Sequence, residues 1–275
     1  MGADLKIAVL MTCHNRKETT LRCLELLYAQ LLPEEVSFNV YLVDDGCTDG
    51  TGEAVKKAYP DITVLQGDGS LFWCNGMRLA WDVAAKEDPD FYLWLNDDSM
   101  LEPHAVSILL ETASSADDAG IVVGSCCDAS TGGFTYGGQR RSGAHPSKLV
   151  PVEPGEEPVV CDTFQGNIVL VSRGTYQKAG NLQSFKHAIG DTDYGYRAQK
   201  AGCAIYVAPG FVATCSKNAH SMERMPLDKR WKTMMTRLPP GDYYRFLRQH
   251  AGIRWVFYWP RPYIRILFST RMENQ

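Results

Sequence analysis

Short apolar runs alternate with helical patterns through residues 7–124, and this alternation restricts the fold more than any other feature. The apolar runs have the length of strands and occupy residues 7–12, 38–43, 62–65, 92–95 and 121–124. Between them, apolar residues recur three or four positions apart, as on one face of a helix. Strands joined by helices form βαβ units and a mainly parallel sheet. The sequence therefore predicts an α/β fold with helices flanking the sheet.

Polar clusters follow three of these strands, at residues 12–16, 44–45 and 96–99. The carboxyl ends of parallel strands meet at one edge of a sheet, and ligands of open α/β sheets gather there. We therefore expect the three clusters to form one site.

The last cluster, Asn96-Asp97-Asp98-Ser99, places two carboxylates side by side after a buried strand. Adjacent carboxylates repel each other, and burying each one costs free energy. A divalent cation removes that cost, because Mg²⁺ and Mn²⁺ prefer hard oxygen ligands. The alternative interpretation is a solvated loop in which Asp98 or Ser99 caps the next helix.

The second half of the chain has a less regular pattern. Residues 128–159 are rich in Gly, Ser and Pro, and short strands near 133–136 and 148–152 suggest a hairpin. A strand at 168–171, a helix at 173–179, a helix at 194–201 and a strand at 204–208 follow. From residue 216 onward the pattern is helical, basic and aromatic.

The charge of the chain is unevenly distributed. The formal net charge is −4, which argues against a nucleic-acid partner. Residues 217–275 nevertheless hold 12 Lys or Arg against 4 Asp or Glu, whereas the preceding residues hold 16 against 28. A basic, aromatic tail fits an anionic membrane surface. Packing of the tail on the acidic body, or on a second subunit in a homodimer, remains the alternative.

The cysteines and the N-terminus favour a cytoplasmic location. The nine cysteines are an odd number without a CxxC pair, so we interpret them as reduced, mostly buried thiols rather than a zinc site. Residues 1–6 lack the pattern of an export signal, and no apolar run approaches the roughly 18–20 residues of a membrane span. We expect a cytoplasmic protein, peripheral at the inner face of the plasma membrane if the tail binds lipid.

Four motifs together resemble the family 2 glycosyltransferases. They are residues 12–16, the Val-Asp-Asp-Gly-Cys-Thr-Asp-Gly-Thr run at 43–51, residues 95–99, and the Gly-Asp-Thr-Asp run that opens 190–202. The resemblance implies a GT-A fold, which is a Rossmann-like nucleotide-binding sheet flanked by helices. It also implies inverting sugar transfer from a nucleotide diphosphate by a domain at 1–220, with a helical extension at 221–275.

The resemblance further implies a donor site with a divalent cation. The cation, Mg²⁺ or Mn²⁺, would bind Asp98, with His220 as a second ligand unless that histidine is merely solvated. Asn96 stands where the strict motif has Asp, so the chain departs from the family's metal-binding pattern at this residue; the family tolerates this, and its last Asp is the metal ligand. Residues expected around the nucleotide-sugar are Thr12, His14, Asn15, Arg16, Asp45, Trp73, Asn75, Asn96, Asp97, Gln165, Gly166 and Asn167. Trp73 has a structural alternative as a core aromatic.

Asp191 occupies the position of the family's catalytic base. A carboxylate held close to an acceptor hydroxyl can take its proton as the new bond forms. His187 lies four residues earlier, so a helical segment would place the two side chains on one face. His187 would then orient Asp191 or touch the acceptor. The alternative is an ordinary loop histidine.

The resemblance implies transfer of rhamnose from dTDP-rhamnose to a saccharide or lipid-linked acceptor during surface polysaccharide assembly. A UDP-hexose or UDP-galactofuranose transferase is the nearest alternative. A nucleotidyltransferase would show a Gly-rich basic loop after the first strand, where this chain has residues 12–16. An inactive sugar-nucleotide-binding protein is disfavoured by the presence of Asp45, Asp98 and Asp191.

Overall fold

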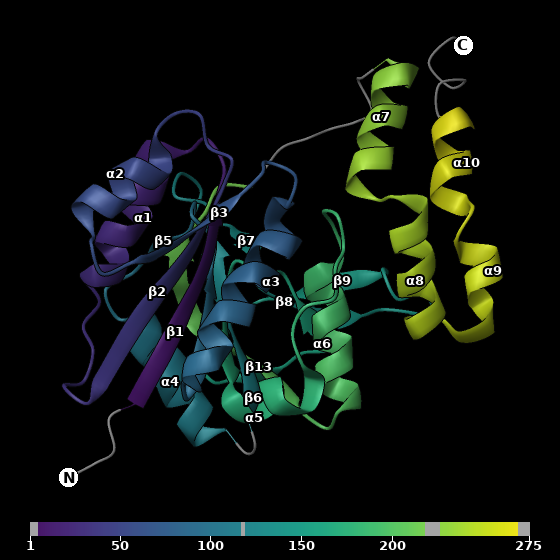
Figure 1. Cartoon of the computed structure of the whole chain (residues 1–275). Helices are drawn as coiled ribbons and strands as arrows, with labels where there is room; N and C mark the ends of the chain where they lie inside the picture. Colours follow the sequence, from purple (N-terminus) through teal and green to yellow (C-terminus); the bar gives the residue numbers. More distant parts are fainter. Residues whose placement is uncertain (1–4, 117–118, 218–225, 269–275) are drawn as a thin grey trace.

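The computed structural model describes residues 5–116, 119–217 and 226–268 (Figure 1). Within these residues one sheet of ten strands dominates, and its main strand order is β10-β13-β6-β12-β4-β1-β2-β3. The four strands predicted first lie at one side of it. They are β1 (Leu5–Cys13), β2 (Val36–Asp45), β3 (Thr63–Gly67) and β4 (Phe91–Leu95). These pair in parallel, which confirms the prediction for this half of the sheet.

The other half of the sheet is mixed. Strand β12 (Ile168–Ser172) runs antiparallel between β4 and β6 (Ala119–Cys127), while the long β13 (Ala204–Thr214) runs parallel to β6. The short strands β5 (Met100–Leu101), β7 (Phe134–Tyr136) and β10 (Val159–Val160) complete it. The result is a mainly parallel sheet with antiparallel members, as in the predicted GT-A fold.

Helices cover both faces of the sheet (Figure 1). Ala8 and Leu10 of β1 pack in one core cluster, and the alternating Val9 and Met11 pack in a second cluster on the opposite face. This alternation explains why the central strands are apolar throughout. The helices of this part are α1 (Lys17–Tyr28), α2 (Thr51–Ala58), α3 (Phe72–Ala84), α4 (Ala105–Ser115), α5 (Arg173–Ala179) and α6 (Gly190–Lys200).

The predicted hairpin between 133–136 and 148–152 is wrong. Strand β7 pairs with β6, whereas β9 (Leu149–Val152) pairs with β8 (Gly138–Arg141). Strand β8 also pairs with β11 (Thr163–Phe164), which makes a small separate sheet. The sequence of β8 is Gly-Gln-Arg-Arg, which lacks the alternation of apolar and polar residues that predicts a strand.

The interpretation of Asp98 or Ser99 as a helix cap is also wrong. Residues Met100 and Leu101 form β5, which pairs with β13, and α4 begins only at Ala105. Its N-cap is His104. Asp97 and Asp98 therefore lie in a turn between β4 and β5 and do not cap α4.

The C-terminal helices are α7 (Leu227–Arg237), α8 (Pro240–His250), α9 (Trp255–Tyr258) and α10 (Arg261–Phe268). Helix α8 buries Tyr243, Phe246 and Leu247 in the core cluster that also contains Trp81 and Trp94. The predicted helical pattern is confirmed for 226–268. Among the described residues, none of the helices has both the length and the hydropathy that crossing a bilayer requires. All nine cysteines are free and seven of them are buried.

Candidate active site

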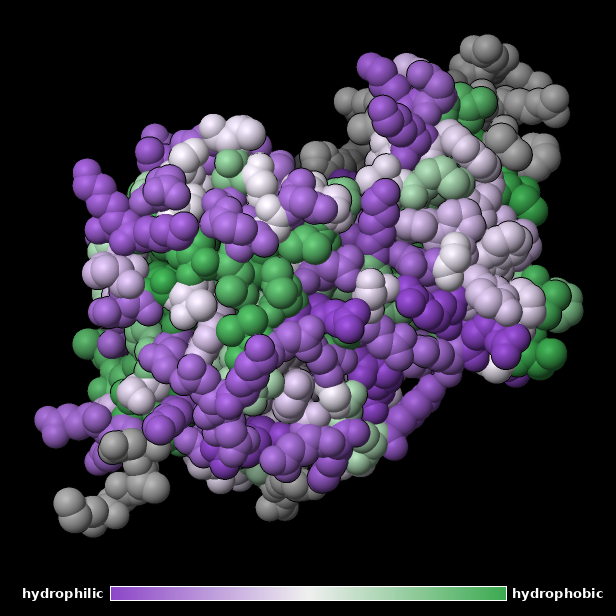
Figure 2. All heavy atoms as spheres, viewed as in Figure 1, coloured by the Kyte–Doolittle hydropathy of each residue, from purple (hydrophilic) through white to green (hydrophobic). Residues whose placement is uncertain are grey.

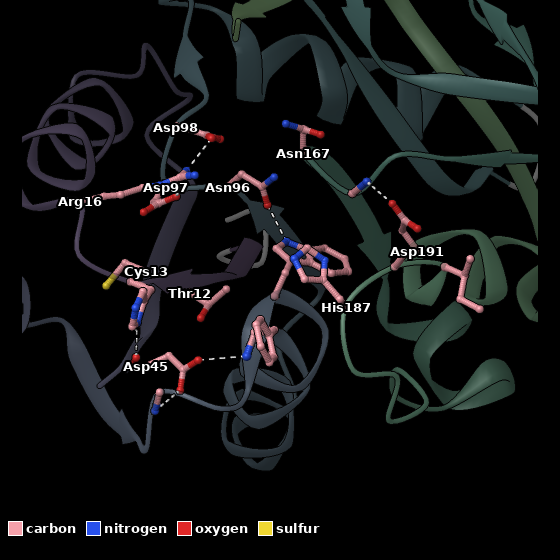
Figure 3. Close-up of a pocket in the computed structure, with 17 residues that line it drawn as sticks. Thr12, Cys13, Arg16, Asp45, Asn96, Asp97, Asp98, Asn167, His187 and Asp191 are labelled. Carbon is pink, nitrogen blue, oxygen red and sulfur yellow. Dashed lines mark hydrogen bonds and ion pairs between the residues drawn. The ribbon is translucent and has the colours of Figure 1, made fainter. Parts of the chain in front are cut away.

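A cavity of about 530 Å³ lies where the carboxyl ends of β1, β2 and β4 meet. Its volume is in the range of small-molecule sites. All three polar clusters contribute to its lining, together with Gly166, Asn167 and the segment that leads into α6 (Figure 3). The three polar clusters therefore line one cavity, as expected for the carboxyl ends of parallel strands.

Asp45, the last residue of β2, organises one wall of this cavity. Its carboxylate accepts three hydrogen bonds from backbone N–H groups, those of Gly69 at 2.8 Å, Leu71 at 3.3 Å and Phe72 at 2.9 Å. These bonds fix the loop that enters α3 and hold Phe72 at a left-handed φ of 55°. A carboxylate has about four acceptor sites, so Asp45 can still accept a hydrogen bond from a ligand.

The acidic corner of the cavity carries a positive side chain. Arg16 Nη1 lies 2.6 Å from Asp98 Oδ2 and 3.3 Å from Asp97 Oδ1 (Figure 3). Asp97 is nearly buried and also accepts a hydrogen bond from Thr20 Oγ1 at 3.2 Å. Burial and the adjacent Asp98 charge raise the pKa of Asp97 to about 6, although Arg16 opposes that rise. Asp98 keeps 26% of its side chain exposed, so it is the carboxylate of the pair that is available to a ligand.

These residues fit a hard divalent cation. Two adjacent carboxylates supply oxygen donors, and the turn already concentrates enough negative charge to hold a guanidinium. Two thiols lie beside this turn: Cys215 Sγ is 3.8 Å from Asp98 Oδ1, and Cys23 Sγ donates to the Ser99 carbonyl at 3.3 Å. His220, the other predicted ligand, lies outside the described residues.

Trp73 lines the cavity next to Asn96. Its indole Nε1–H donates to Asn96 Oδ1 at 2.6 Å (Figure 3). The ring also lies so close to Gly166 that a Cβ built there would sit 2.5 Å from it. Trp73 is therefore both half-buried packing and cavity lining, and Asn96 offers its amide N–H₂ group to a ligand.

Asp191 lies on the opposite wall, in the first turn of α6. Its Oδ1 accepts from its neighbour Thr192 N–H at 2.7 Å, and its Oδ2 accepts from Gly166 N–H at 3.2 Å. Burial raises the pKa of Asp191, while these hydrogen bonds act in the opposite direction. A carboxylate with a raised pKa is a better proton acceptor than an ordinary aspartate.

His187 lines the same cavity, but its predicted helical relation to Asp191 is wrong. Helix α6 begins at Gly190, so residues 186–189 form bends before it. The imidazole instead packs against Phe72, with ring centroids 5.4 Å apart. Burial and the nearby Arg237 charge lower the pKa of His187, which favours the neutral ring.

A family model described as glycosyl transferase family 2 matches residues 8–174, which is more than half of the chain. The chain belongs to glycosyl transferase family 2. The match includes the strands and turns that carry Asp45, Asp97 and Asp98, and it confirms the predicted family. The protein is a glycosyltransferase, and its sheet and helices have the GT-A fold.

Among curated proteins, this family 2 member is 28% identical over 235 residues to N-acetylglucosaminyl-diphospho-decaprenol L-rhamnosyltransferase of Mycobacterium tuberculosis. The alignment covers 74% of this chain and 74% of that relative. Among solved structures, the mannosyltransferase PcManGT of Pyrobaculum calidifontis, in complex with GDP-Man and Mn²⁺, aligns with a TM-score of 0.58 and 15% identity, over 96% of this chain and 73% of its own. TarS 1-349 of S. aureus in complex with UDP-GlcNAc gives 0.60 and 15%, over 92% and 73%. These two structures support the fold.

Most of the predicted site residues of this glycosyltransferase line the cavity. Those in the lining are Thr12, His14, Arg16, Asp45, Trp73, Asn96, Asp97, Asp98, Gly166, Asn167, His187 and Asp191. Asn15, Asn75 and Gln165 are not among them. Asn15 Oδ1 accepts from Thr48 N–H at 2.7 Å, and Asn75 Nδ2 donates to the carbonyl of Phe185 at 3.1 Å, so both amides stabilise neighbouring loops.

Five lining residues were not predicted, namely Cys13, Gly69, Phe72, Ala188 and Ile189. Cys13 lies between two predicted residues and could have been included with them. Gly69 and Phe72 follow a predicted strand end. Ala188 and Ile189 carry no polar group, so only their proximity to Asp191 could have indicated them.

Proposed function

We propose that this protein transfers rhamnose from dTDP-rhamnose to a lipid-linked saccharide in the assembly of a surface polysaccharide. The observation that carries the proposal is the presence in one cavity of Asp45, Asp98 and Asp191, from three separate parts of the chain. The M. tuberculosis relative, named for rhamnosyl transfer to a decaprenyl-linked acceptor, supports this donor and acceptor class. We assign the transferase domain to residues 1–220 and a helical extension to 221–275.

Asp98, with Asp97 beside it, is our candidate for holding a divalent cation, Mg²⁺ or Mn²⁺. Such an ion supplies Lewis-acid stabilisation of the charge that develops on the leaving diphosphate. Arg16 reaches the same corner and can pair with a phosphate oxygen when its bond to Asp98 is given up. The mannosyltransferase of similar fold, solved in complex with GDP-Man and Mn²⁺, supports this cation class.

Asp191 is our candidate for the base. Its carboxylate faces the cavity from the wall opposite Arg16 and is already oriented by the N–H groups of Thr192 and Gly166. In a single displacement it takes the acceptor hydroxyl proton as the acceptor oxygen bonds to the anomeric carbon. The bond from that carbon to the diphosphate breaks on the opposite face, so the product has inverted configuration.

The nucleoside end of the donor is assigned to the wall organised by Asp45. His14 and Thr12 from β1 and the loop at Gly69 lie there, and His14 Nδ1 is 2.6 Å from the Asp45 carbonyl oxygen. These groups offer donors and acceptors to the edge of a pyrimidine base. Trp73, held by Asn96, supplies an apolar surface for the sugar.

The C-terminal helices are assigned to contact with an anionic membrane at the inner face of the plasma membrane. Ile253 is 81% exposed and Phe257 is 67% exposed. Figure 2 shows hydrophobic side chains at the edge of the molecule where Figure 1 places α9. Residues 226–268 hold nine Lys or Arg and two Asp or Glu. Exposed apolar side chains within a basic segment match an interfacial helix, and a lipid-linked acceptor would be met at that surface.

The experiment is a panel of dTDP-, UDP- and GDP-sugars, each tested for thermal stabilisation of the protein with and without Mn²⁺ or Mg²⁺. We expect the largest cation-dependent shift with dTDP-rhamnose. A larger shift with a UDP-sugar would indicate that the donor is a UDP-sugar rather than dTDP-rhamnose. Stabilisation by no sugar of the panel would contradict nucleotide-sugar binding at this cavity.

A further inference from the structure

The segment just before Asp191 is held between α3 and the C-terminal helices. From α3, Cys74 Sγ donates to the Gln183 carbonyl at 3.2 Å and Asn75 Nδ2 donates to the Phe185 carbonyl at 3.1 Å. Residues 183–188 make four hydrogen bonds to α8 or to the end of α7. They join Gln183 to Gln249 (3.1 Å), the Ser184 carbonyl to Arg245, Lys186 N–H to Asp242 Oδ2 (2.7 Å), and Ala188 N–H to the Arg237 carbonyl (3.3 Å). The Arg245 guanidinium also lies over the Phe185 ring, 4.6 Å from its centroid.

A fifth hydrogen bond from the C-terminal helices reaches α6 itself, two residues after Asp191. Asp193 is fully buried, and its Oδ1 lies 2.8 Å from Nε2 of His250, the last residue of α8. Its Oδ2 accepts from Arg197 Nε at 2.8 Å. The other imidazole nitrogen, His250 Nδ1, is 3.3 Å from Lys200 Nζ. Since an ammonium group only donates, Nδ1 accepts, and a neutral ring then carries its proton on Nε2 and donates it to Asp193.

The backbone between these contacts is strained. Ile189, the N-cap residue of α6, has φ 68° and ψ −3°, a left-handed conformation that a β-branched residue rarely adopts. Such a conformation is unfavourable and persists only where the surrounding structure determines it. Here the surroundings are the Ala188 bond to α7 on one side and the Asp193–His250 bond on the other.

We infer that His250 is a positioning residue for the base. Through Asp193 it fixes the first turn of α6, and α8 fixes the preceding segment, so that together they aim the Asp191 carboxylate into the cavity. The C-terminal helices then complete the acceptor side of the active site, in addition to the membrane contact proposed for them. Figure 1 shows α8 beside α6, where this coupling takes place. The inference rests on the proposed role of Asp191.

Two substitutions of His250 separate positioning from general packing. The side-chain nitrogen of glutamine can reach the place of the imidazole Nε2, whereas that of asparagine reaches only the place of Nδ1. His250→Gln therefore keeps a donor for Asp193, and His250→Asn removes it. The exposed His104→Asn, on the N-cap of α4, is the matched control.

The readouts are steady-state transfer and hydrogen–deuterium exchange of the free enzyme over residues 183–193. We expect His250→Asn to lower kcat by about tenfold to a hundredfold, the effect of a misplaced catalytic group, with KM for the nucleotide-sugar unchanged. Exchange over 183–193 should rise in the same variant. His250→Gln and His104→Asn should stay close to wild type in both readouts.

Wild-type kcat and wild-type exchange in His250→Asn would overturn the inference. Equal losses in the Gln and Asn variants, accompanied by weaker nucleotide-sugar binding, would also overturn it, because they indicate a purely structural role. If the wild-type enzyme transfers no sugar from any nucleotide donor, the proposed function fails instead. The exchange comparison still decides whether His250 orders the segment in that case.

Discussion

The guanidinium of Arg16 lies 2.6 Å from the carboxylate of Asp98, in the corner of the cavity where two adjacent acids meet. The contact joins the N-cap of α1 to the turn after β4. It places a positive charge at the corner where we propose that a divalent cation binds. On that proposal Arg16 and the cation would compete for Asp98, and cation binding would release the guanidinium to pair with phosphate.

Asp98→Asn should abolish cation-dependent stabilisation by the nucleotide-sugar, because the amide is a much weaker ligand than the carboxylate for Mn²⁺ or Mg²⁺. Thermal unfolding with and without each cation measures this. Asp61→Asn, an exposed change away from the cavity, is the control and should behave as wild type. An unchanged cation response in Asp98→Asn would place the ion elsewhere.

Asp191→Asn should lower the rate of transfer by about 10²- to 10⁴-fold, the usual contribution of a general base. The Asn side chain keeps an oxygen that can accept from Gly166 N–H, so nucleotide-sugar affinity should stay near wild type. Single-turnover transfer and equilibrium binding measure the two quantities. A fully active variant would show that another group takes the proton.

The acid limb of the activity profile should lie above the ordinary titration range of aspartate. Burial raises the pKa of Asp191, and only the deprotonated carboxylate can act as a base. Activity is therefore lost as pH falls through the raised pKa and regained as pH rises through it. The pH dependence of kcat/KM for the wild-type enzyme measures this, and a flat profile down to about pH 4, the ordinary range of a carboxyl, would exclude it.

Gly166→Ala should destabilise the fold by about 1–3 kcal/mol, the usual effect of overpacking. A Cβ at this position would lie 2.5 Å from the Trp73 ring, which the Asn96 bond holds in place. Chemical denaturation measures the loss. Gly174→Ala in α5, where the nearest heavy atom is 3.9 Å away, is the control and should be neutral or stabilising.

Ile253→Ser with Phe257→Ser should weaken binding to vesicles that contain anionic lipid. Full burial of each apolar side chain contributes about 1.5–3 kcal/mol, so the double change should reduce binding at least tenfold. Vesicle sedimentation measures the binding. Val160→Ser, at an exposed position of β10, is the control. Equal vesicle binding by the double variant and the wild-type protein would show that this surface does not contact the membrane.

The part of the site that follows from the sequence is the part built on strand ends. Asp45, Asp97 and Asp98 end apolar runs, and parallel pairing brings such ends to one edge of a sheet whatever the details of packing. The first four strands could also be predicted from the sequence, because each is a short apolar run and the same alternation of apolar run and helical pattern repeats along the chain.

The unpredicted features depend on contacts between residues far apart in the chain. Asn96 meets Trp73 only after α3 packs against the sheet, and Asp193 meets His250 across 57 positions. The left-handed Ile189 cannot be foreseen from a residue type that disfavours this conformation. Strand β8 could not be predicted, because its sequence does not alternate between apolar and polar residues.

The decisive measurement for the proposed mechanism is the configuration of the product formed from dTDP-rhamnose and a synthetic polyprenyl-diphosphate-linked N-acetylglucosamine, determined by NMR. We predict a rhamnosyl product whose anomeric configuration is inverted relative to the donor, formed by the wild-type enzyme and almost absent with Asp191→Asn. A product with retained configuration, or undiminished formation by Asp191→Asn, would contradict a single displacement assisted by that carboxylate.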